Sequence, residues 1–486
     1  MKITKFSIIV PLVCAVVGSD NVCAQDTADG SAVCTVGSLE LISTGSSPEV
    51  FRIIEEARPD EPNAVPVPKF TLRTRDNKFM LSIGGKINPI MGYDIGNNLY
   101  NVDGAGSNFI PGDIPVPALQ GHKGDFFINA LNGDVDFTMA GLGGTPNRIT
   151  GYIKIGTDGI SKGIKLKRAY ITYRRVTAGL RHSTATDNEA LQPNTIDPQG
   201  PNGDFCTSNY QLAYNSPSYS GFSWAAAIEM PSFCNSNGIY RGHDFQSWHG
   251  QKVDADVDQL IPDVPVWVQY EFSDNNRLRL TGLLRGFAYQ DMVNSSRQTV
   301  LGWGAMVSGN FSFWKPLVFN FQAVYGKGIG NYIQDLAGRP LSFTPKSSEL
   351  GKMEANPMMG LVFGASWNIS SKWQFNAVGS YARVWNVGNY AIASDYAATD
   401  ANGTQVHAAG NGNYRYGIYA VANVFYHITS YLDWGLEYCY GRHETYGLGG
   451  VNDSRIQTQQ ETVFRLIRVC RRPKDCRYSD LQGDGI

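Results

Sequence analysis

The stretch NRLRLTGLLRGFAY, residues 276–289, separates its side chains into two sets by position. The even-numbered positions from 278 to 288 hold only leucine, glycine and alanine, whereas Arg277, Arg279 and Arg285 occupy odd-numbered positions. A repeat of two residues is typical of a β-strand, because successive side chains on a strand point to opposite faces. This strand therefore has one apolar face and one face that carries three arginines.

The composition favours an all-β protein over a helical one. The chain has 486 residues, of which 17% are charged and 12% are aromatic, and it contains 53 glycines. Glycine and aromatic residues at this level, with few charges, are typical of sheet proteins. The length suggests several domains, although a β-barrel runs this long as one unit. The net charge of -2 argues against nucleic acid as a partner.

The N-terminus predicts export. Lys2 and Lys5 precede the apolar run FSIIVPLVCAVVG, and small residues end at Ala24, so residues 1–24 are expected to be a cleaved signal peptide. A lipoprotein is disfavoured, because neither Cys14 nor Cys23 follows a good small-residue box. No later stretch approaches the ~20 apolar residues of a spanning helix. The exported chain is therefore expected to be soluble or to cross a membrane as strands.

Six cysteines follow the signal segment, without the CxxC spacing of zinc sites. Cys206 and Cys234 flank a predicted hairpin, so the pair is a candidate disulfide. We expect no metal and no cofactor.

Sixteen segments have the pattern of strands. They lie near residues 78–94, 125–140, 148–157, 164–174, 176–182, 208–215, 221–229, 264–272, 276–289, 299–312, 316–327, 357–368, 372–385, 413–428, 430–442 and 454–465.

The connections between these segments alternate in length. The segments near 95–124, 183–207, 230–263, 328–356 and 386–412 are long, whereas the links SDNN, FWKP, ISSK and ITSY are tight. Short turns at one end and long loops at the other are typical of outer-membrane barrels, with the short turns in the periplasm. A soluble sandwich has no physical reason for this asymmetry.

Alternation supports this interpretation in several segments. In SYLDWGLEYCYGRH (residues 430–443), Leu432, Trp434 and Leu436 share one face, opposite Asp433 and Glu437. The segment IKLKRAYITYR (residues 164–174) instead changes phase after its second lysine, which predicts a β-bulge or a wrongly assigned strand.

These patterns predict an all-β fold, a 16-stranded antiparallel transmembrane β-barrel over residues 78–465. Strands cross hydrocarbon only as a closed barrel, because lipid offers no partner for an unpaired backbone group. Sixteen strands enclose a water-filled lumen, so the arginine face of residues 276–289 is expected to line a pore. The alternative is a soluble sheet whose arginine face meets bulk water.

Four stretches also resemble the DcaP-like trimeric outer-membrane porins. These are KRAYITYRRVTAGLRHSTATDNEALQPNTIDPQGPNG (residues 167–203), GYIKI (151–155), NYQLAY (209–214) and YGKGIGNYI (325–333), and the PNTIDPQGPNG portion is the most specific. The resemblance covers most of residues 78–465. It implies a homotrimer whose barrels conduct small hydrophilic solutes, with a preference for anionic ones such as dicarboxylates.

The residues expected to line the pore are mostly basic, which predicts weak anion selectivity. The segment 183–207 is expected to fold inward and narrow the lumen. Some of these charges are expected to pair with neighbouring strands instead of contacting solute. The basic candidates are Lys86, Arg148, Lys154, Lys165, Arg168, Arg277, Arg279, Arg285 and Arg415, and the acidic ones are Asp94, Asp136, Asp433 and Glu437 on strands and Asp187, Glu189 and Asp197 in the loop.

Two regions depart from the family pattern. Residues 25–77 are proline-rich and lack heptads, so they are expected to be a periplasmic linker and not a coiled-coil arm. After Gln460 the alternation is lost, and residues 466–486 form a basic tail with two cysteines. A frameshift and a genuine periplasmic extension both explain this tail. The expected partners are outer-membrane lipids, lipopolysaccharide, the barrel-assembly machinery and small solutes.

An enzyme is not expected. The seven histidines are scattered, and no GxSxG motif occurs. His182 and Ser183 are adjacent on a strand and point to opposite faces, so they do not form a nucleophile and base pair. The remaining alternative is a barrel-anchored surface receptor or adhesin with little conductance. A measurable ion current through the purified protein would indicate the porin, and its absence would indicate the receptor or adhesin.

Overall fold

A computed structural model describes most of the chain outside its two ends and its longest connections. The described residues are 22–26, 32–36, 39–42, 70–74, 78–96, 108–118, 124–130, 133–141, 147–157, 163–188, 190, 195–197, 199–231, 258–273, 276–291, 294–337, 339, 341–345, 352–385, 413–429 and 432–463.

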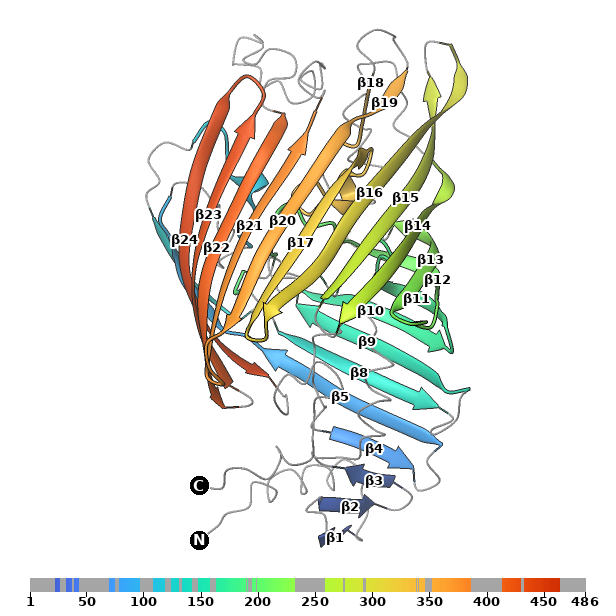
Figure 1. The fold of residues 1–486 in the computed structure, drawn as a ribbon, viewed down its shortest axis with the longest axis vertical. Helices are drawn as coiled ribbons and strands as arrows, with labels where there is room; N and C mark the ends of the chain where they lie inside the picture. Colours follow the sequence, from blue (N-terminus) through green and yellow to red (C-terminus); the bar gives the residue numbers. More distant parts are fainter. Residues whose placement is uncertain are drawn as a thin grey trace.

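One antiparallel sheet of 22 strands dominates the described residues, and a small two-stranded sheet accompanies it (Figure 1). The large sheet contains β1 (Val22–Asp26), β2 (Ala32–Val36), β3 (Leu39–Ile42), β4 (Phe70–Thr74), β5 (Phe79–Ile87), β6 (Ile90–Asp94), β7 (Asp125–Asn129), β8 (Asp134–Gly141), β9 (Ile149–Thr157), β10 (Ile164–Tyr173), β11 (Val176–His182), β12 (Ser208–Asn215), β13 (Phe222–Pro231), β14 (Asp258–Ser273), β15 (Asn276–Asp291), β16 (Ser296–Trp314), β17 (Leu317–Lys327), β20 (Pro357–Asn368), β21 (Trp373–Val384), β22 (Tyr414–Thr429), β23 (Leu432–Thr445) and β24 (Gly449–Val463). The small sheet pairs β18 (Phe343–Pro345) with β19 (Met353–Ala355), and two short 3₁₀ helices, η2 (Pro111–Asp113) and η4 (Gly330–Tyr332), lie in loops.

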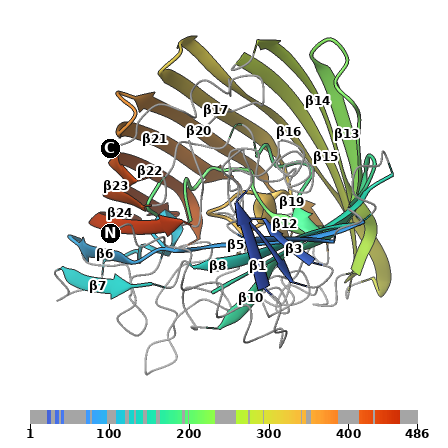
Figure 2. The same cartoon turned by 90° about the horizontal axis from the view of Figure 1, so that it is seen from below.

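The pairing of the large sheet returns to where it began. β5 pairs with β8, and from β8 to β24 each strand of this sheet pairs with the next one along the chain. β24 then pairs with both β5 and β6, through residues such as Thr462 opposite Ile87 and Ile456 opposite Tyr93. Figure 2 shows the sheet curving around a central region that loops enter. We call this set of paired strands the ring.

The number of strands differs from the predicted 16. Every predicted segment contains a strand, but two of them are divided, giving β5 with β6 and β7 with β8. Asn88 and Pro89 separate β5 from β6, and proline has no N–H to donate to the ladder. Strands β2, β3 and β4 lie within residues 25–77, which were predicted to be a linker, and β4 pairs with β5.

The all-β, antiparallel character of the fold and the irregularity in residues 164–174 are confirmed. The register between β9 and β10 shifts between Leu166 and Arg168, so Lys167 is the extra residue of a bulge. The bulge explains why the alternation changes phase at this position.

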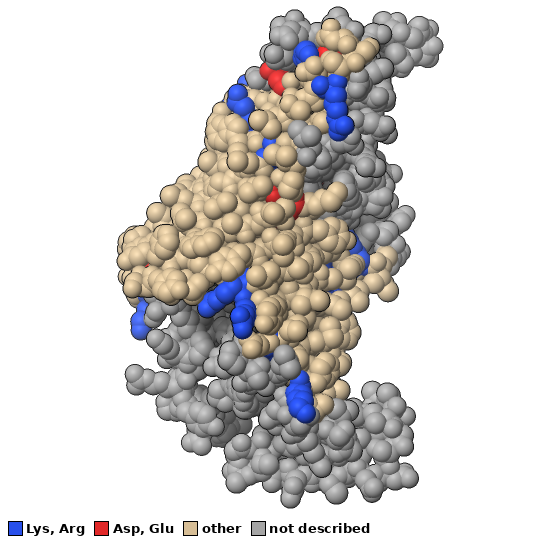
Figure 3. Space-filling model, turned by 90° about the vertical axis from the view of Figure 1, so that its right-hand side faces the viewer, with Lys and Arg blue, Asp and Glu red and all other residues tan. Residues whose placement is uncertain are grey.

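The two faces of the ring differ as the alternation predicts. Leu280 and Leu284 are 53% and 60% exposed on the outer face of β15, whereas Arg285 is 1% exposed on the inner face. Figure 3 shows a broad band of uncharged side chains on one outer side, with lysine and arginine mostly toward its upper and lower margins. Within the described parts of the chain, no helix has the length and apolar character needed to cross a membrane.

Candidate functional site

The loop between β11 and β12 folds into the interior of the ring. Its first residues are fixed by Glu229 of β13, which accepts hydrogen bonds from the Ser183 hydroxyl (2.7 Å) and the Thr184 N–H (2.6 Å). The Thr184 hydroxyl bonds Gln211 at 2.6 Å. The loop is therefore attached to the neighbouring strands as soon as β11 ends.

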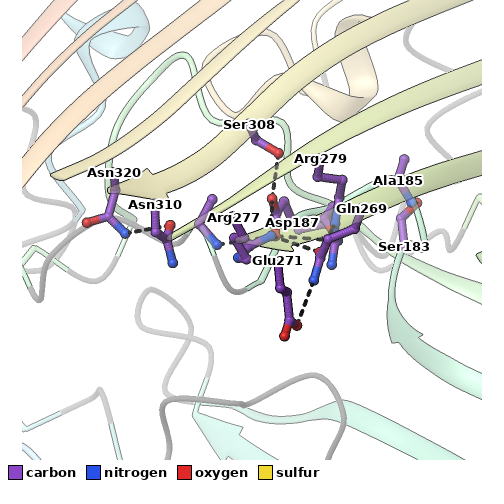
Figure 4. Close-up of polar contacts among 12 residues, drawn as sticks. Ser183, Ala185, Asp187, Gln269, Glu271, Arg277, Arg279, Ser308, Asn310 and Asn320 are labelled. Atoms are coloured by element: carbon purple, nitrogen blue, oxygen red, sulfur yellow. Dashed lines mark hydrogen bonds and ion pairs between the residues drawn. The ribbon is translucent and has the colours of Figure 1, made fainter. Parts of the chain in front are cut away.

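Asp187 attaches the loop to the arginine face of β15 (Figure 4). Arg277 donates two hydrogen bonds to its carboxylate, from Nη2 at 2.7 Å and from Nη1 at 3.0 Å. Arg279 Nη1 lies 3.4 Å from the same carboxylate, and Ser308 of β16 donates its hydroxyl proton to it. A bidentate arginine bond of this kind fixes direction as well as distance.

The charges around Asp187 are arranged to keep its carboxylate ionised. Burial raises the pKa of Asp187, but the guanidinium groups of Arg279 and Arg277 more than offset burial and hold the pKa well below its ordinary value. Gln269 of β14 accepts from both arginines, and Arg279 stacks over the Trp267 ring at 4.2 Å. Two of the arginines of the opening stretch therefore hold a loop in place.

The third arginine has a different partner. Arg285 Nε donates to Asp263 of β14 at 3.0 Å, and Arg285 Nη1 donates to the backbone oxygen of Gly328 at 2.7 Å. Tyr332 in η4 donates its hydroxyl proton to the same Asp263 at 2.7 Å. Arg285 thus attaches the loop that follows β17 to the wall of the ring.

A pair of buried carboxylates holds the middle of the 183–207 loop. Glu437 of β23 accepts the backbone N–H of Ile196 at 2.7 Å and of Asp197 at 2.9 Å. The Asp197 carboxylate accepts the Phe109 N–H at 3.0 Å and the Tyr419 hydroxyl of β22 at 3.0 Å. Asp197 therefore joins two loops to the wall formed by β22 and β23.

The environment of Asp197 makes this attachment dependent on pH. Burial raises the pKa of Asp197 to about 6, the Phe109 N–H opposes the shift, the Glu437 charge adds to it, and Arg455 and Tyr419 oppose it. A carboxyl whose pKa is raised on docking binds its proton more tightly when the loop is docked. The contribution of Asp197 to docking is therefore largest at low pH. It is lost as the pH rises from the ordinary pKa of 3.8 to the raised pKa of about 6.

A cluster of basic side chains lies on β5, β9 and β10. Lys86 of β5, Lys154 of β9, and Lys165 and Arg168 of β10 are all half-buried. Lys154 Nζ lies 3.6 Å from Asp134 of β8. The structure thus gathers four of the predicted basic residues on neighbouring strands.

Lys167 belongs to the same cluster and was not among the predicted residues. Its Nζ lies 3.9 Å from Asp134, and its stem passes over Gly156, where a Cβ would lie 2.6 Å from Nζ. The bulge turns Lys167 inward beside Arg168. The phase change in residues 164–174 was the sequence signal for it.

Arg168 also contacts the base of the 183–207 loop. It meets His182 Nε2 and donates to the Ser208 hydroxyl at 2.9 Å. Cys206 Sγ lies 3.6 Å from His182 Nδ1. Its predicted disulfide partner, Cys234, lies outside the described residues, and so does Glu189.

Among the remaining predicted residues, Asp136 of β8 lies directly opposite Lys154 of β9 in the strand register, and the others lie elsewhere. Arg415 forms an ion pair with Glu444 at 3.3 Å, and Asp433 bonds His427 at 2.8 Å. Arg148 is half-buried just before β9, Asp136 is buried on β8, and Asp94 of β6 forms an ion pair with Arg455 of β24. The sequence analysis did not predict four charged residues that form contacts inside the ring, because alternation reports the face of a residue and not its partner. These are Arg455, Asp263, Glu229 and Asp335.

Comparison with known proteins gives likenesses to solved structures only. No protein-family model matches the sequence, and no curated protein matches it. The outer membrane channel DcaP of Acinetobacter baumannii superimposes with a TM-score of 0.62 at 15% identity, covering 80% of this chain and 99% of that chain. OmpT of Vibrio cholerae gives a TM-score of 0.44 at 8% identity, and OmpF of Salmonella typhi gives a TM-score of 0.43 at 10% identity. Each covers 79% of this chain and 98% of its own chain.

TM-scores below 0.5 do not establish a shared fold, so only the first of these likenesses is informative. It extends over nearly the whole of the DcaP chain. The resemblance noted in the sequence is therefore confirmed at the level of the fold, and the chain has the fold of the DcaP outer-membrane channel.

Proposed function

We propose that the chain is an outer-membrane porin, a closed antiparallel β-barrel through which small hydrophilic solutes diffuse. The observation that carries this proposal is the two-faced ring. Its strand pairing returns to β5, its outer face is apolar and its inner face is charged. An apolar outer band with a polar interior is the arrangement that lets strands cross lipid around water.

We infer further that the lysines, and not the arginines of β15, contact solute. The side chains of Lys154 and Lys167 are 18% and 32% exposed, whereas those of Arg277 and Arg279 are 6% and 7% exposed. Charges that face an open lumen set ion preference. The basic cluster on β5, β9 and β10 therefore supports a preference for anionic solutes, dicarboxylates among them.

The test is the reversal potential of the purified protein in a planar bilayer under a salt gradient. We expect a stable conductance that favours anions. The double variant Lys154→Gln, Lys167→Gln should shift the reversal potential toward cations, whereas Lys372→Gln, an exposed lysine in a short turn, should leave it unchanged. A cation-favouring wild type would reject the lysine assignment and leave the channel standing.

A second candidate is a barrel-anchored receptor with little conductance. The loops that enter the interior of the ring favour it, because a lumen obstructed by loops passes few ions. Absence of current from protein shown to be folded by its heat-modifiable migration on gels would select this candidate.

We also propose that the signal peptide is cleaved after Ala24 and that three copies assemble in the outer membrane. Mass spectrometry of the mature N-terminus and the mass of the detergent-purified complex test these two points. A measured mass equal to that of one chain would reject the proposed trimer, and it would leave the proposed channel function unaffected.

A further inference from the structure

We infer that three loops inside the ring form one unit that moves together, and that Asp335 is the positioning residue that joins them. They consist of the described residues within 108–118, 183–207 and 328–345, named the first, second and third loop in chain order. The effect of these loops on pore width rests on the proposed channel function. The contacts that join the loops do not depend on that function.

Asp335 lies in the third loop, and its carboxylate bonds to both other loops and to the wall. Oδ1 accepts the backbone N–H of Gly112 in the first loop at 2.8 Å, and Oδ2 accepts Asn202 Nδ2 of the second loop at 3.3 Å. The Tyr414 hydroxyl of β22 donates to Oδ2 as well. Asp335 is 2% exposed, so these bonds form away from bulk water, where unmade bonds are costly.

The backbone of the third loop is joined to the second loop independently of this carboxylate. Asp335 N–H donates to the Asn202 oxygen at 3.0 Å, and Gln334 N–H donates to the Asp204 oxygen at 2.9 Å. Phe205 forms a β-bridge with Ile333, and its ring stacks on Tyr332 at 5.3 Å. The second and third loops therefore form one packed body.

The first loop is attached to both of the others by separate contacts. Asn108 donates to Gln199 of the second loop at 2.9 Å, and Asp197 accepts the Phe109 N–H. Arg339 of the third loop donates to Asp113 at 2.6 Å. Each pair of loops is thus in direct contact, and Asp335 is the residue that touches both of the other loops through one side chain.

Close approach at two glycines shows how tightly the carboxylate is enclosed. A Cβ at Gly112 would lie 2.6 Å from Asp335 Oδ1, and one at Gly417 would lie 2.5 Å from Asp335 Oδ2. Both distances are shorter than real Cβ contacts, so the first loop and β22 reach the carboxylate only because these positions lack a side chain.

The experiment measures hydrogen exchange and conductance on the same detergent-purified, full-length proteins. Hydrogen exchange followed by mass spectrometry reports peptides covering residues 108–118, 199–207 and 328–345, and planar bilayers report single-channel conductance. The variants are Asp335→Ala and the near-isosteric Asp335→Asn. The matched control is Asp291→Ala, which removes a buried carboxylate of β15 whose contacts include Lys352 and Asn294.

We expect Asp335→Ala to speed exchange in the first and second loops together by roughly tenfold or more, as loss of bonds to a charged acceptor implies. Asp335→Asn should give a smaller increase, because its amide keeps one acceptor, and Asp291→Ala should leave both peptides unchanged. Faster exchange confined to the third loop would overturn the inference. If Asp335→Ala does not fold, Asp335→Asn and the control decide the same question.

Conductance separates this inference from the proposed function. Coupled exchange with no current from any protein would support the three-loop unit and reject the channel. A conducting wild type with uncoupled exchange would support the channel and reject the three-loop unit. A rise in single-channel conductance that accompanies coupled exchange supports both.

Discussion

Replacing Asp187 by alanine should release the start of the 183–207 loop from the ring wall. The Asp187 carboxylate accepts two hydrogen bonds from Arg277 and lies 3.4 Å from Arg279, and its side chain is 0% exposed. The substitution leaves two guanidinium groups buried beside each other without their shared anion. Like charges in contact repel, so the loss exceeds that of one hydrogen bond.

The size of the effect follows from this geometry. Removing one member of a buried ion pair costs roughly 3–5 kcal/mol, most of it from the partner charge left unpaired. A change of about 3 kcal/mol multiplies the undocked population by more than 100, since each ~1.4 kcal/mol is tenfold. Asp187→Asn keeps the shape and one acceptor, so its effect should be smaller. The contacts of Asp197 and Asp335 remain, so the loop should fluctuate at one end while staying attached at the other.

Single-channel recording is the assay. Wild-type protein should show one stable level, whereas Asp187→Ala should show larger current noise and a higher mean conductance. Hydrogen exchange in residues 183–188 should rise in parallel. Unchanged noise, conductance and exchange in a folded Asp187→Ala protein would refute the view that the arginines of β15 hold this loop.

Three further predictions follow from single contacts. Lowering the pH from 7 to about 4.5 should favour loop docking by about 2 kcal/mol, because docking raises the pKa of Asp197 from 3.8 to about 6. Conductance should therefore fall, and Asp197→Asn should remove this dependence on pH. Gly156→Val should displace the Lys167 side chain, because a Cβ there would lie 2.6 Å from Nζ, and the reversal potential should shift toward cations. Arg285→Met should leave Asp263 buried without its 3.0 Å partner, which costs roughly 3–5 kcal/mol, measured as a lower urea midpoint for loss of the heat-modifiable band.

The strands were predictable because alternation is a local property. Each of the 16 predicted segments contains a strand, and the phase change after residue 167 marked the bulge in β10. The division at Asn88 and Pro89 was also visible, since proline cannot donate to a ladder. Strands β1–β4 were not predicted, because short alternating stretches such as FTLRT in β4 stand among prolines and turn residues.

The site was predictable only in part, because alternation gives the face of a residue and not its partner. Arg277 and Arg279 face inward as expected, but their contact with Asp187 joins positions 90 residues or more apart in sequence. No local pattern reports that distance. The same limit hid Asp335, which meets Gly112 across 223 residues.

The division of labour between arginine and lysine is physically reasonable and gives a last prediction. Arginine holds a carboxylate in a fixed, bidentate geometry, whereas lysine carries one mobile charge on a flexible stem. The arginines of β15 should therefore control the width of the lumen, and Lys154 and Lys167 should control its ion preference. Because the two groups lie on different strands, their effects should add.

The combined variant Asp187→Ala, Lys154→Gln, Lys167→Gln tests this separation. Its conductance should match that of Asp187→Ala after correction for the lost lysines, and its reversal potential should match that of the lysine variant. If the loop variant alone shifted the reversal potential as far as the lysine variant does, width and selectivity would share one determinant. The basic cluster on β9 and β10 would then owe its effect to the position of the loop and not to its own charge.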